Sequence, residues 1–320
     1  MKTKPQPCLD EIMPIFPLER APVRISRLAL GCAPLGNLYH PISDKQAVDL
    51  IHYALNKNVV LFDTAPRYGM SELRLGLALR NIPRQRFTLS TKVGWSLTPE
   101  GRFRPDFSRE GILRGIEASL GRLGLDRIDI VHLHDPDWNY KQALNEAFPA
   151  LSELREQGAI GAVSVGMNQW EMLSDFAHNA DFDCFLLAGR YTLLRQESLA
   201  FLDLCREKHI TILLGGVYNS GILATGAVEE AKFDYHAAPL EIMERVRSLQ
   251  LICDSYRVPL RALALQFPLA HPAVASLVVG AETSQEFNQT FEGLCWEIPP
   301  ELWQDLRTRG LINEASPLPL

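Results

Sequence analysis

Short runs of apolar and β-branched residues alternate with longer segments of helical periodicity from residue 27 onward. This alternation is typical of repeated strand and helix units around a parallel sheet. Most of the runs are apolar almost throughout, as expected of strands that are covered on both faces. Eight runs are expected to be strands, at 27–32, 59–63, 87–92, 128–134, 160–165, 184–188, 210–214 and 275–279. The pattern therefore favours either a closed barrel or an open, doubly wound sheet.

The number of strands and the first loop favour the barrel. Eight strand and helix units in order match a (β/α)8 barrel, which needs about 250 residues. An open nucleotide-binding sheet would carry G-x-G-x-x-G after its first strand, whereas residues 31–36 read GCAPLG. We predict an α/β fold, a (β/α)8 TIM barrel with an extra C-terminal helix. The whole chain, 1–320, is expected to form one domain, with residues 1–25 as an N-terminal lead-in segment.

Two of the intervening segments carry explicit signals for a helix start. Ser43 and Gln46 form an S-x-x-Q capping box, after which apolar residues recur on one stripe at 3.6-residue spacing. Ser108 has the same position at the start of a later segment. We therefore expect helices to begin directly after Ser43 and Ser108.

Composition and charge exclude several classes of protein. The net charge of −6 gives no broad basic surface for nucleic acid. There is no apolar run of 18 residues and no secretory leader pattern, so we expect neither a membrane span nor secretion. The cysteines lack C-x-x-C spacing and are expected to be free thiols in a reducing compartment. They are Cys8, Cys32, Cys184, Cys205, Cys253 and Cys295. A cytoplasmic protein that acts on a small molecule is the prediction, as a monomer or a small homo-oligomer.

Ionisable residues follow three consecutive predicted strands at the points where they end. Asp63 ends the second strand and Tyr68 lies in the loop after it, while Lys92 and His134 end the third and fourth strands. In a barrel the C-terminal ends of the strands meet at one face, where catalytic residues are found. A carboxylate, a phenol, an amine and an imidazole are therefore expected at one mouth.

This set of groups suits acid–base chemistry at an oxygen atom. An ammonium beside a phenol stabilises the phenolate and lowers the pKa of the phenol. Lys92 is expected to supply that charge, Asp63 to hold Lys92 protonated, and His134 to orient a substrate oxygen. The protein has no redox group of its own, so a hydride must come from a cofactor.

Simpler roles exist for each of these residues taken singly. A strand-end aspartate often forms a turn, a strand-end lysine is often a solvated charge, and a loop tyrosine often only packs. The pair His132 and His134 has the spacing for zinc, although no other predicted strand ends in histidine. Cys32 ends the first predicted strand and is more readily explained by packing than by nucleophilic chemistry.

Three ordered motifs resemble the aldo-keto reductase family. Residues 61–69 read LFDTAPRYG, residues 89–93 read LSTKV, and residues 117–134 read EASLGRLGLDRIDIVHLH. The resemblance extends over about residues 25–295. It implies a barrel, a nicotinamide cofactor bound without a Rossmann unit, and Asp63, Tyr68, Lys92 and His134 as the catalytic tetrad.

Two further segments resemble one branch of that family. Residues 131–137 read VHLHDPD and residues 186–194 read LLAGRYTLL. They are similar to the branch of aldose 1-dehydrogenases, such as L-fucose or D-threo-aldose dehydrogenase, and pyridoxal 4-dehydrogenase. The resemblance implies oxidation of an aldose or a related cyclic hemiacetal to its lactone, in which the hydroxyl proton passes to Tyr68.

The resemblance also implies which residues bind the cofactor. Residues 164–168 read SVGMN where the family commonly has GVSNF, so the usual serine and asparagine of this strand are absent. Asn168 is expected to bind the carboxamide of the cofactor in their place. Residues 215–219 read GGVYN, so the tyrosine that usually stacks on the nicotinamide is absent. The remaining expected contacts are Gly31, Cys32, Asp63, Gly280 and the pyrophosphate loop Ser220, Gly221, Ile222 and Leu223.

Glu282 and Glu286 stand where many relatives have basic residues for the 2′-phosphate of NADP. Carboxylates repel a phosphate and can accept a hydrogen bond from a free ribose hydroxyl. Both residues also suit the first turn of a helix, where acidic side chains are favourable. We predict NAD in preference to NADP.

Four functions follow from these expectations. The leading one is an NAD(P)-dependent aldose dehydrogenase; the alternatives are a pyridoxal 4-dehydrogenase or a general aldehyde and ketone reductase. Outside enzymes, the chain would be a cofactor-sensing regulatory subunit. No metal is expected. Candidates for lining the mouth, on aromatic character alone, are His40, Trp95, Phe103, Trp138 and Tyr140.

Overall fold

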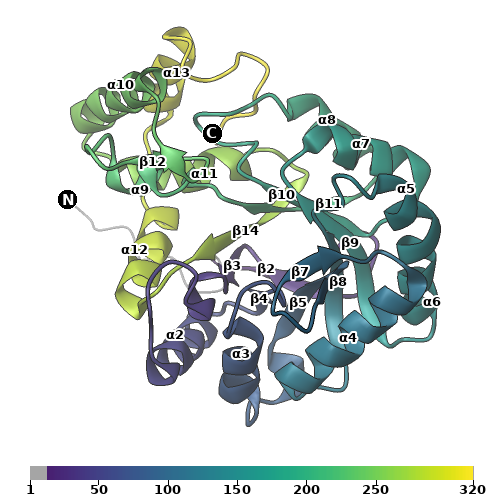
Figure 1. Cartoon of the computed structure of the whole chain (residues 1–320). Helices are drawn as coiled ribbons and strands as arrows, with labels where there is room; N and C mark the ends of the chain where they lie inside the picture. The colour runs from purple at the N-terminus through teal and green to yellow at the C-terminus, as the bar shows by residue number, and fades with distance from the viewer. Residues whose placement is uncertain (1–12, 320) are drawn as a thin grey trace.

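Eight parallel strands close into a barrel in the computed structural model, which describes residues 13–319 (Figure 1). The hydrogen-bonded order around the barrel is β10-β11-β14-β3-β4-β5-β8-β9. The strands are β3 (Leu28–Gly31), β4 (Leu61–Asp63), β5 (Thr88–Val93), β8 (Ile128–His134), β9 (Ile160–Met167), β10 (Cys184–Ala188), β11 (Thr211–Gly215) and β14 (Val274–Gly280). Each matches one predicted run, and the prediction of a barrel is confirmed.

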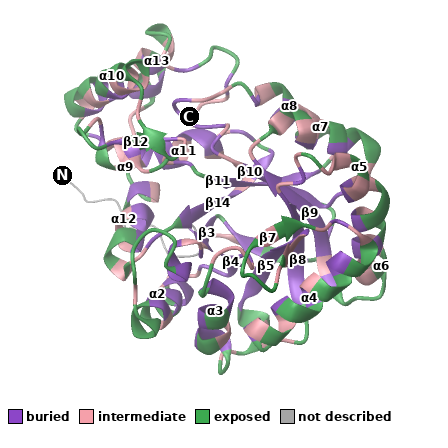
Figure 2. Cartoon of the chain, in the orientation of Figure 1, coloured by how far each residue is buried: buried purple, intermediate pink, exposed green. Residues whose placement is uncertain are grey.

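Helices surround the barrel and turn their buried faces toward it (Figure 2). The helices that follow successive strands are α2 (Asp44–Asn56), α3 (Ser71–Leu79), α4 (Arg109–Leu123), α6 (Phe148–Glu156), α7 (Trp170–Asn179), α8 (Leu199–Glu207), α11 (Leu260–Leu269) and α12 (Ser284–Leu294). Two more, α10 (Leu240–Tyr256) and α13 (Pro300–Thr308), pack against each other outside this ring. The predicted extra C-terminal helix is therefore present as α13.

Short elements complete the described part of the chain. They are the turns of helix η1 (Pro34–Gly36), η2 (Arg84–Arg86), α5 (Tyr140–Gln142), η3 (Ala143–Ala147) and α9 (Ile222–Thr225), and the strands β1 (Ile15–Pro17), β2 (Arg24–Ser26), β6 (Trp95–Leu97), β7 (Phe103–Pro105), β12 (Lys232–Phe233) and β13 (His236–Ala237). No helix within residues 13–319 has the length and apolar character needed to cross a membrane.

The predicted helix starts agree with the structure. The Ser43 side chain accepts a hydrogen bond from the Gln46 amide, and the Gln46 side chain accepts one from the Ser43 amide, so the capping box is complete. The Ser108 hydroxyl accepts a hydrogen bond from the Gly111 amide at the start of α4. These caps satisfy amides that a helix leaves unpaired at its first turn.

The described part of the predicted lead-in segment forms an antiparallel hairpin, β1 with β2, at the N-terminal end of the barrel. The Arg20 side chain donates to the carbonyl oxygens of Lys208 and Phe182, which lie just before β11 and β10. Leu18 and Ile25 pack on apolar side chains inside the barrel. The hairpin thus closes the end of the barrel opposite to the strand ends that carry the ionisable residues. Residues 1–12, which include Cys8, lie outside the described part.

Apolar side chains form two layers of core. One fills the space between the outer faces of the strands and the helices. The other lies within the barrel and includes Ala29, Leu61, Ile130 and Leu213. Because side chains alternate between the faces of a strand, each strand supplies both layers. The remaining opening is at the C-terminal ends of the strands, which we call the mouth.

Candidate active site

Neighbouring strands bring the predicted catalytic residues together at the mouth. Strand β4 pairs with β5, and β5 pairs with β8. Asp63 is the last residue of β4, Lys92 lies near the end of β5, and His134 is the last residue of β8. Tyr68 follows β4 in a loop before α3. All four predicted residues therefore lie in one region.

Lys92 is the buried centre of the group. Its Nζ donates to Oδ2 of Asp63 over 2.6 Å and to the carbonyl oxygen of Thr64 over 2.8 Å. Burial lowers the pKa of Lys92, but the Asp63 carboxylate and the Tyr68 hydroxyl more than offset this and raise it above its ordinary value. The Asp63 carboxylate thus favours the protonated form of Lys92.

Ser90 is a partner of the site that was not predicted from the sequence. Its hydroxyl donates to Oδ1 of Asp63 over 2.7 Å, while Oδ2 accepts from Lys92. Ser90 and Lys92 are two residues apart on β5 and therefore face the same side of the strand. This spacing is the signal that would have identified Ser90.

The Tyr68 ring packs beside Lys92 and His134. Nζ of Lys92 lies 4.9 Å from the centroid of the Tyr68 ring, and the Tyr68 and His134 rings meet edge to face with centroids 6.0 Å apart. Burial raises the pKa of Tyr68, the positive charge of Lys92 lowers it, and the net direction is upward. The expected lowering by Lys92 is present, but burial outweighs it, so the phenol is neutral at neutral pH in the protein alone.

A close contact between two loops fixes the position of Tyr68. Gly36 lies against the main chain of Tyr68, and a methyl group at Gly36 would overlap the Tyr68 carbonyl. Gly69, with a φ of 51°, lies against the carbonyl of Gly36 in return. The Ser71 hydroxyl donates to the Cys32 carbonyl oxygen over 2.8 Å. The loop after β3 therefore holds the loop that carries Tyr68.

His134 is buried and neutral. Burial lowers the pKa of His134 well below its ordinary value, and the positive charges of Lys92 and Arg67 lower it further. The indole Nε1 of Trp95 donates to the His134 carbonyl oxygen over 2.7 Å. Trp95, one of the aromatic candidates for the mouth, thus ties β6 to the end of β8.

His132 and Cys32 have structural surroundings. Nδ1 of His132 lies 2.8 Å from the Ser164 hydroxyl inside the barrel, and burial lowers its pKa to about 3. The Cys32 thiol is fully buried and donates to the Leu30 carbonyl oxygen, and burial raises the pKa of this thiol. Within residues 13–319 no three metal-ligating side chains gather at one point.

Two of the expected cofactor residues face each other between strands. Gly31 of β3 pairs with Gly280 of β14. A methyl group added at Gly31 would lie 3.2 Å from the Val278 side chain, and one added at Gly280 would lie 2.9 Å from the Pro34 ring. Asn168 is half-buried and directly follows β9. All three positions lie at the C-terminal ends of their strands, Gly31 beside Asp63 of β4 and Asn168 on the far side of β8.

The predicted pyrophosphate loop follows β11 and enters α9. Asn219, Ser220 and Gly221 have φ values of 46°, 59° and 97° in succession. Space is open around Gly221, where a methyl group would meet nothing within 4 Å. Ile222 and Leu223 are buried beneath the loop. Tyr218 turns away toward α12, where its hydroxyl donates to Thr290 over 3.2 Å.

Glu282 and Glu286 lie at the start of α12 and already have partners. The Glu286 carboxylate accepts from the Glu282 amide over 2.8 Å, in keeping with a role at the first turn of the helix. The Glu282 carboxylate lies 2.9 Å from Nδ1 of His40, which comes from the loop between β3 and α2. His40 therefore lies near the end of β14, where the adenosine of the cofactor is expected to bind.

The other aromatic candidates for the mouth differ in their surroundings. Tyr140 packs on Phe176 with ring centroids 4.6 Å apart, which is a packing role. Phe103 is half-buried in β7. Trp138, in contrast, is 98% exposed in the loop after β8.

Arg67 and Asp135 meet at the mouth beside the predicted group. Nη1 of Arg67 lies 3.5 Å from Oδ2 of Asp135, and its guanidinium carbon lies 4.3 Å from the centroid of the Trp95 ring. Arg67 precedes Tyr68 in the sequence, and Asp135 follows His134. Neither was predicted as a site residue, because a loop arginine and a loop aspartate are common on any surface.

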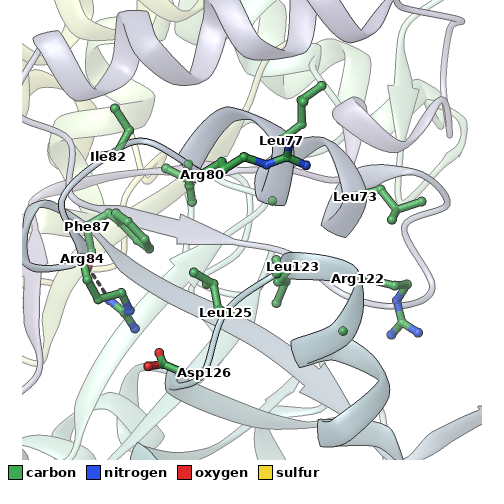
Figure 3. A pocket seen from close by; sticks show the side chains of 14 residues that line it. Leu73, Leu77, Arg80, Ile82, Arg84, Phe87, Arg122, Leu123, Leu125 and Asp126 are labelled. Atoms are coloured by element: carbon green, nitrogen blue, oxygen red, sulfur yellow. Dashed lines mark hydrogen bonds between the residues drawn. The ribbon is translucent and has the colours of Figure 1, made fainter.

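A separate hollow of about 740 Å³ lies between α3 and α4 (Figure 3). Leu73, Leu77 and Leu123 line it together with Arg80 and Phe87. Phe87 directly precedes β5, whose other end carries Lys92. The hollow is therefore remote from the mouth and does not belong to the candidate site.

Comparison with known proteins supports the family resemblance seen in the sequence. The sequence profile of the aldo/keto reductase family matches residues 27–308. A pyridoxal 4-dehydrogenase of Microbacterium luteolum is 39% identical, with 92% of this chain and 97% of that protein covered. A D-threo-aldose 1-dehydrogenase of a Pseudomonas species is 37% identical, with 91% of this chain and 96% of that protein covered.

A solved structure shares the fold. The holo form of an aldo-keto reductase from Bacillus halodurans superposes with a TM-score of 0.79 at 23% identity, covering 95% of this chain and 97% of that chain. At this level of identity the likeness concerns the barrel and its surrounding helices alone.

Proposed function

The chain belongs to the aldo/keto reductase family, and on that premise we propose that Asp63, Tyr68, Lys92 and His134 form its catalytic group. Membership confirms the resemblance inferred from the three sequence motifs. Aldo-keto reductases use nicotinamide cofactors, and this chain is an oxidoreductase of that kind. The proposal depends on one observation: the Lys92 ammonium is buried at the mouth between the Asp63 carboxylate and the Tyr68 ring.

Tyr68 is the residue that transfers the proton in this proposal. In oxidation, the substrate hydroxyl gives its proton to the ionised oxygen of Tyr68 while the carbon that bears it loses a hydride. Lys92 stabilises the ionised form of Tyr68, and Asp63 holds the ammonium in place. Neutral His134 hydrogen bonds to the substrate oxygen and orients it.

The residues at the mouth suit a nicotinamide cofactor, which when bound accepts or supplies the hydride. Gly31 and Gly280 leave room that side chains would fill, and Cys32 lies beside them at the first strand end. Asn168 offers an amide for the carboxamide group. The open space around Gly221 and the exposed hydroxyl of Ser220 suit a pyrophosphate, with Ile222 and Leu223 holding the loop on the core.

NAD is the proposed cofactor rather than NADP. The Glu282 carboxylate stands at the end of β14, and a 2′-phosphate placed there would meet a negative charge. Glu286 adds a second carboxylate, although its contact with the Glu282 amide gives it a role in the helix start.

The proposed substrates are aldoses and related cyclic hemiacetals, oxidised to lactones. Support comes from two relatives that share more than a third of their sequence with this chain, a pyridoxal 4-dehydrogenase and a D-threo-aldose 1-dehydrogenase. The mouth is also lined by charged groups, Arg67 and Asp135, which suit a polar substrate.

Reduction of an aldehyde or ketone is the second candidate, and the state of Tyr68 favours it. Burial keeps the phenol protonated in the protein alone, so it can donate a proton to a carbonyl oxygen. The same four residues serve both directions.

The test of the proposed function is the variant Tyr68→Phe, with Tyr218→Phe as its matched control. Tyr218 is a half-buried tyrosine near the cofactor loop, and its hydroxyl hydrogen bonds to α12. NADH formation from L-fucose, D-arabinose, L-galactose and pyridoxal, and NADH consumption with simple aldehydes, are measured for each protein. Tyr68→Phe should lower kcat by about 1,000-fold or more while cofactor affinity changes little. Near-normal turnover in Tyr68→Phe would refute the assignment.

A further inference from the structure

Arg67 and Asp135 form an ion pair that connects the two halves of the candidate catalytic group. Arg67 adjoins Tyr68 in the loop after β4, and Asp135 adjoins His134 at the end of β8. Because the Tyr68 and His134 rings are 6.0 Å apart, the pair lies beside the place where a substrate oxygen would bind. Any substituent next to the reacting carbon would therefore approach Arg67 and Asp135.

Both side chains retain hydrogen-bonding capacity. Their closest atoms are 3.5 Å apart, longer than a normal hydrogen bond, and the side chains are 36% and 35% exposed. Within residues 13–319 neither side chain makes a hydrogen bond, and Nε2 of His134 lies 3.6 Å from Oδ2 of Asp135. A carboxylate and a guanidinium side by side offer both acceptors and donors to a ligand.

The pair is held in a defined place. The Arg67 guanidinium stacks on Trp95 at 4.3 Å, and Trp95 in turn donates to the His134 carbonyl oxygen. Asp135 has a φ of 44°, in the left-handed region, and its amide donates to the Gly166 carbonyl oxygen over 3.0 Å. A strained backbone conformation at a non-glycine residue beside a catalytic group is often retained for function.

We propose that Arg67 and Asp135 bind the hydroxyl group on the carbon next to the reacting carbon, so that the substrate is a polyhydroxylated hemiacetal. The Asp135 carboxylate accepts the hydrogen bond of this hydroxyl, and the Arg67 guanidinium donates to its oxygen. Trp95 is a positioning residue that fixes Arg67. This inference rests on the proposed function and adds the feature of the substrate that is recognised.

Chemistry favours a sugar over a simple aldehyde at this pair. A hydroxyl group both donates and accepts, so it can bind a carboxylate and a guanidinium at the same time, and charge-assisted hydrogen bonds are stronger than neutral ones. A substrate without the neighbouring hydroxyl would leave both charged groups without that partner. Simple aldehydes should therefore be poor substrates compared with aldoses.

The experiment compares an aldose with its 2-deoxy counterpart in wild type, Asp135→Asn and Arg67→Met. Asparagine tolerates the left-handed backbone well, so Asp135→Asn removes the charge with little strain. The best aldose among L-fucose, D-arabinose and L-galactose is used; for D-arabinose the counterpart is 2-deoxy-D-ribose. The control is Asp305→Asn, which removes the charge from an ion pair between Asp305 of α13 and Arg309, the residue that follows the helix at its C-terminal end.

Wild type should prefer the aldose over its 2-deoxy counterpart by at least about 10-fold in kcat/KM, because the 2-deoxy sugar cannot form the hydrogen bonds to these charged groups. Asp135→Asn and Arg67→Met should each lower kcat/KM for the aldose by about 10-fold or more, mainly through KM. In both variants, kcat/KM for the 2-deoxy sugar should change by less than about 3-fold. Asp305→Asn should match wild type with both sugars.

Two results would overturn the inference. If either variant slows the aldose and the 2-deoxy sugar equally, the pair positions Tyr68 and His134 but does not bind the hydroxyl. If wild type does not distinguish the two sugars, the neighbouring hydroxyl is not recognised. In both cases the proposed function stands, provided that Tyr68→Phe abolishes oxidation. If wild type oxidises no hemiacetal at all, the proposed function and this inference fail together.

Discussion

Nζ of Lys92 lies 2.6 Å from Oδ2 of Asp63 inside the barrel, where neither side chain is more than 4% exposed. An ion pair so deeply buried has lost the hydration of both charges, and only the mutual attraction and hydrogen bonds offset that cost. Removal of one partner therefore leaves the other charge buried without compensation. This relationship has consequences for stability that are independent of catalysis.

The losses of stability in the two single variants of this pair should add up to more than the loss in the double variant. Asp63→Asn and Lys92→Met should each lower the free energy of unfolding by about 3 kcal/mol or more, because each leaves one buried charge. The double variant should lose much less than the sum of the two losses. Urea unfolding followed by circular dichroism measures these differences. Lys45→Met, which breaks an exposed pair with Asp49, should change stability by less than about 0.5 kcal/mol; strictly additive losses would contradict the coupling.

Oxidation should accelerate with rising pH. The pKa of Tyr68 is raised above its ordinary value by burial, so at neutral pH the phenol is protonated and few molecules hold the ionised oxygen that accepts a proton. The fraction of ionised Tyr68 increases as the pH approaches that raised pKa, and kcat/KM for oxidation should increase with it. Reduction needs the protonated phenol and should be flat over the same range and fall only beyond it.

The measurement is a pair of pH profiles, one for each direction, between about pH 7 and pH 10. A profile for oxidation that is independent of pH across this range would contradict a proton transfer to Tyr68. Unfolding curves at each pH identify any loss of the folded state at the alkaline end. Because folding raises the pKa of Tyr68, the unfolded chain ionises first, and this group lowers stability only once the pH exceeds the ordinary tyrosine pKa of about 10.

Gly36→Ala should damage both stability and activity. The added methyl group would overlap the Tyr68 carbonyl, so one of the two loops must move. Displacement of Tyr68 by even about 1 Å can cost about 100-fold in rate. Gly121→Ala is the control, because Gly121 lies inside α4 and a methyl group there meets nothing within 4 Å.

The control should gain up to about 1 kcal/mol in stability through the better helix propensity of alanine, with unchanged turnover. Thermal unfolding and kcat are measured for both variants. Wild-type activity in Gly36→Ala would show that the loop after β3 does not hold Tyr68.

Glu282→Gln should shift the preference between cofactors toward NADP. Without the carboxylate at the end of β14, the repulsion of a 2′-phosphate is weaker, and the ratio of kcat/KM for NAD to that for NADP should fall by about 10-fold. Glu292→Gln, further along α12, is the control, since Glu292 accepts a hydrogen bond from Asn288 within the helix. An unchanged ratio in Glu282→Gln would dissociate this carboxylate from cofactor choice.

The amino-acid sequence by itself determined the elements and their order. Each of the eight strands and the capping box at Ser43 depend on residues close together in the chain, so local patterns suffice to predict them. Because parallel strands all end at one face, the sequence also indicated that Asp63, Lys92 and His134 lie together. The hairpin of residues 15–26, which closes the opposite end of the barrel, was expected only as a lead-in segment.

Only the tertiary structure decided the contacts within the site. The approach of Arg67 to Asp135, the hydrogen bond from Ser90 to Asp63 and the ion pair of His40 with Glu282 join segments that the sequence keeps apart. Such distances depend on the closure of the barrel and on how its loops fold over the mouth. Burial also depends on this closure. The Lys92 charge alone would lower the pKa of Tyr68, but burial outweighs it and the pKa is raised.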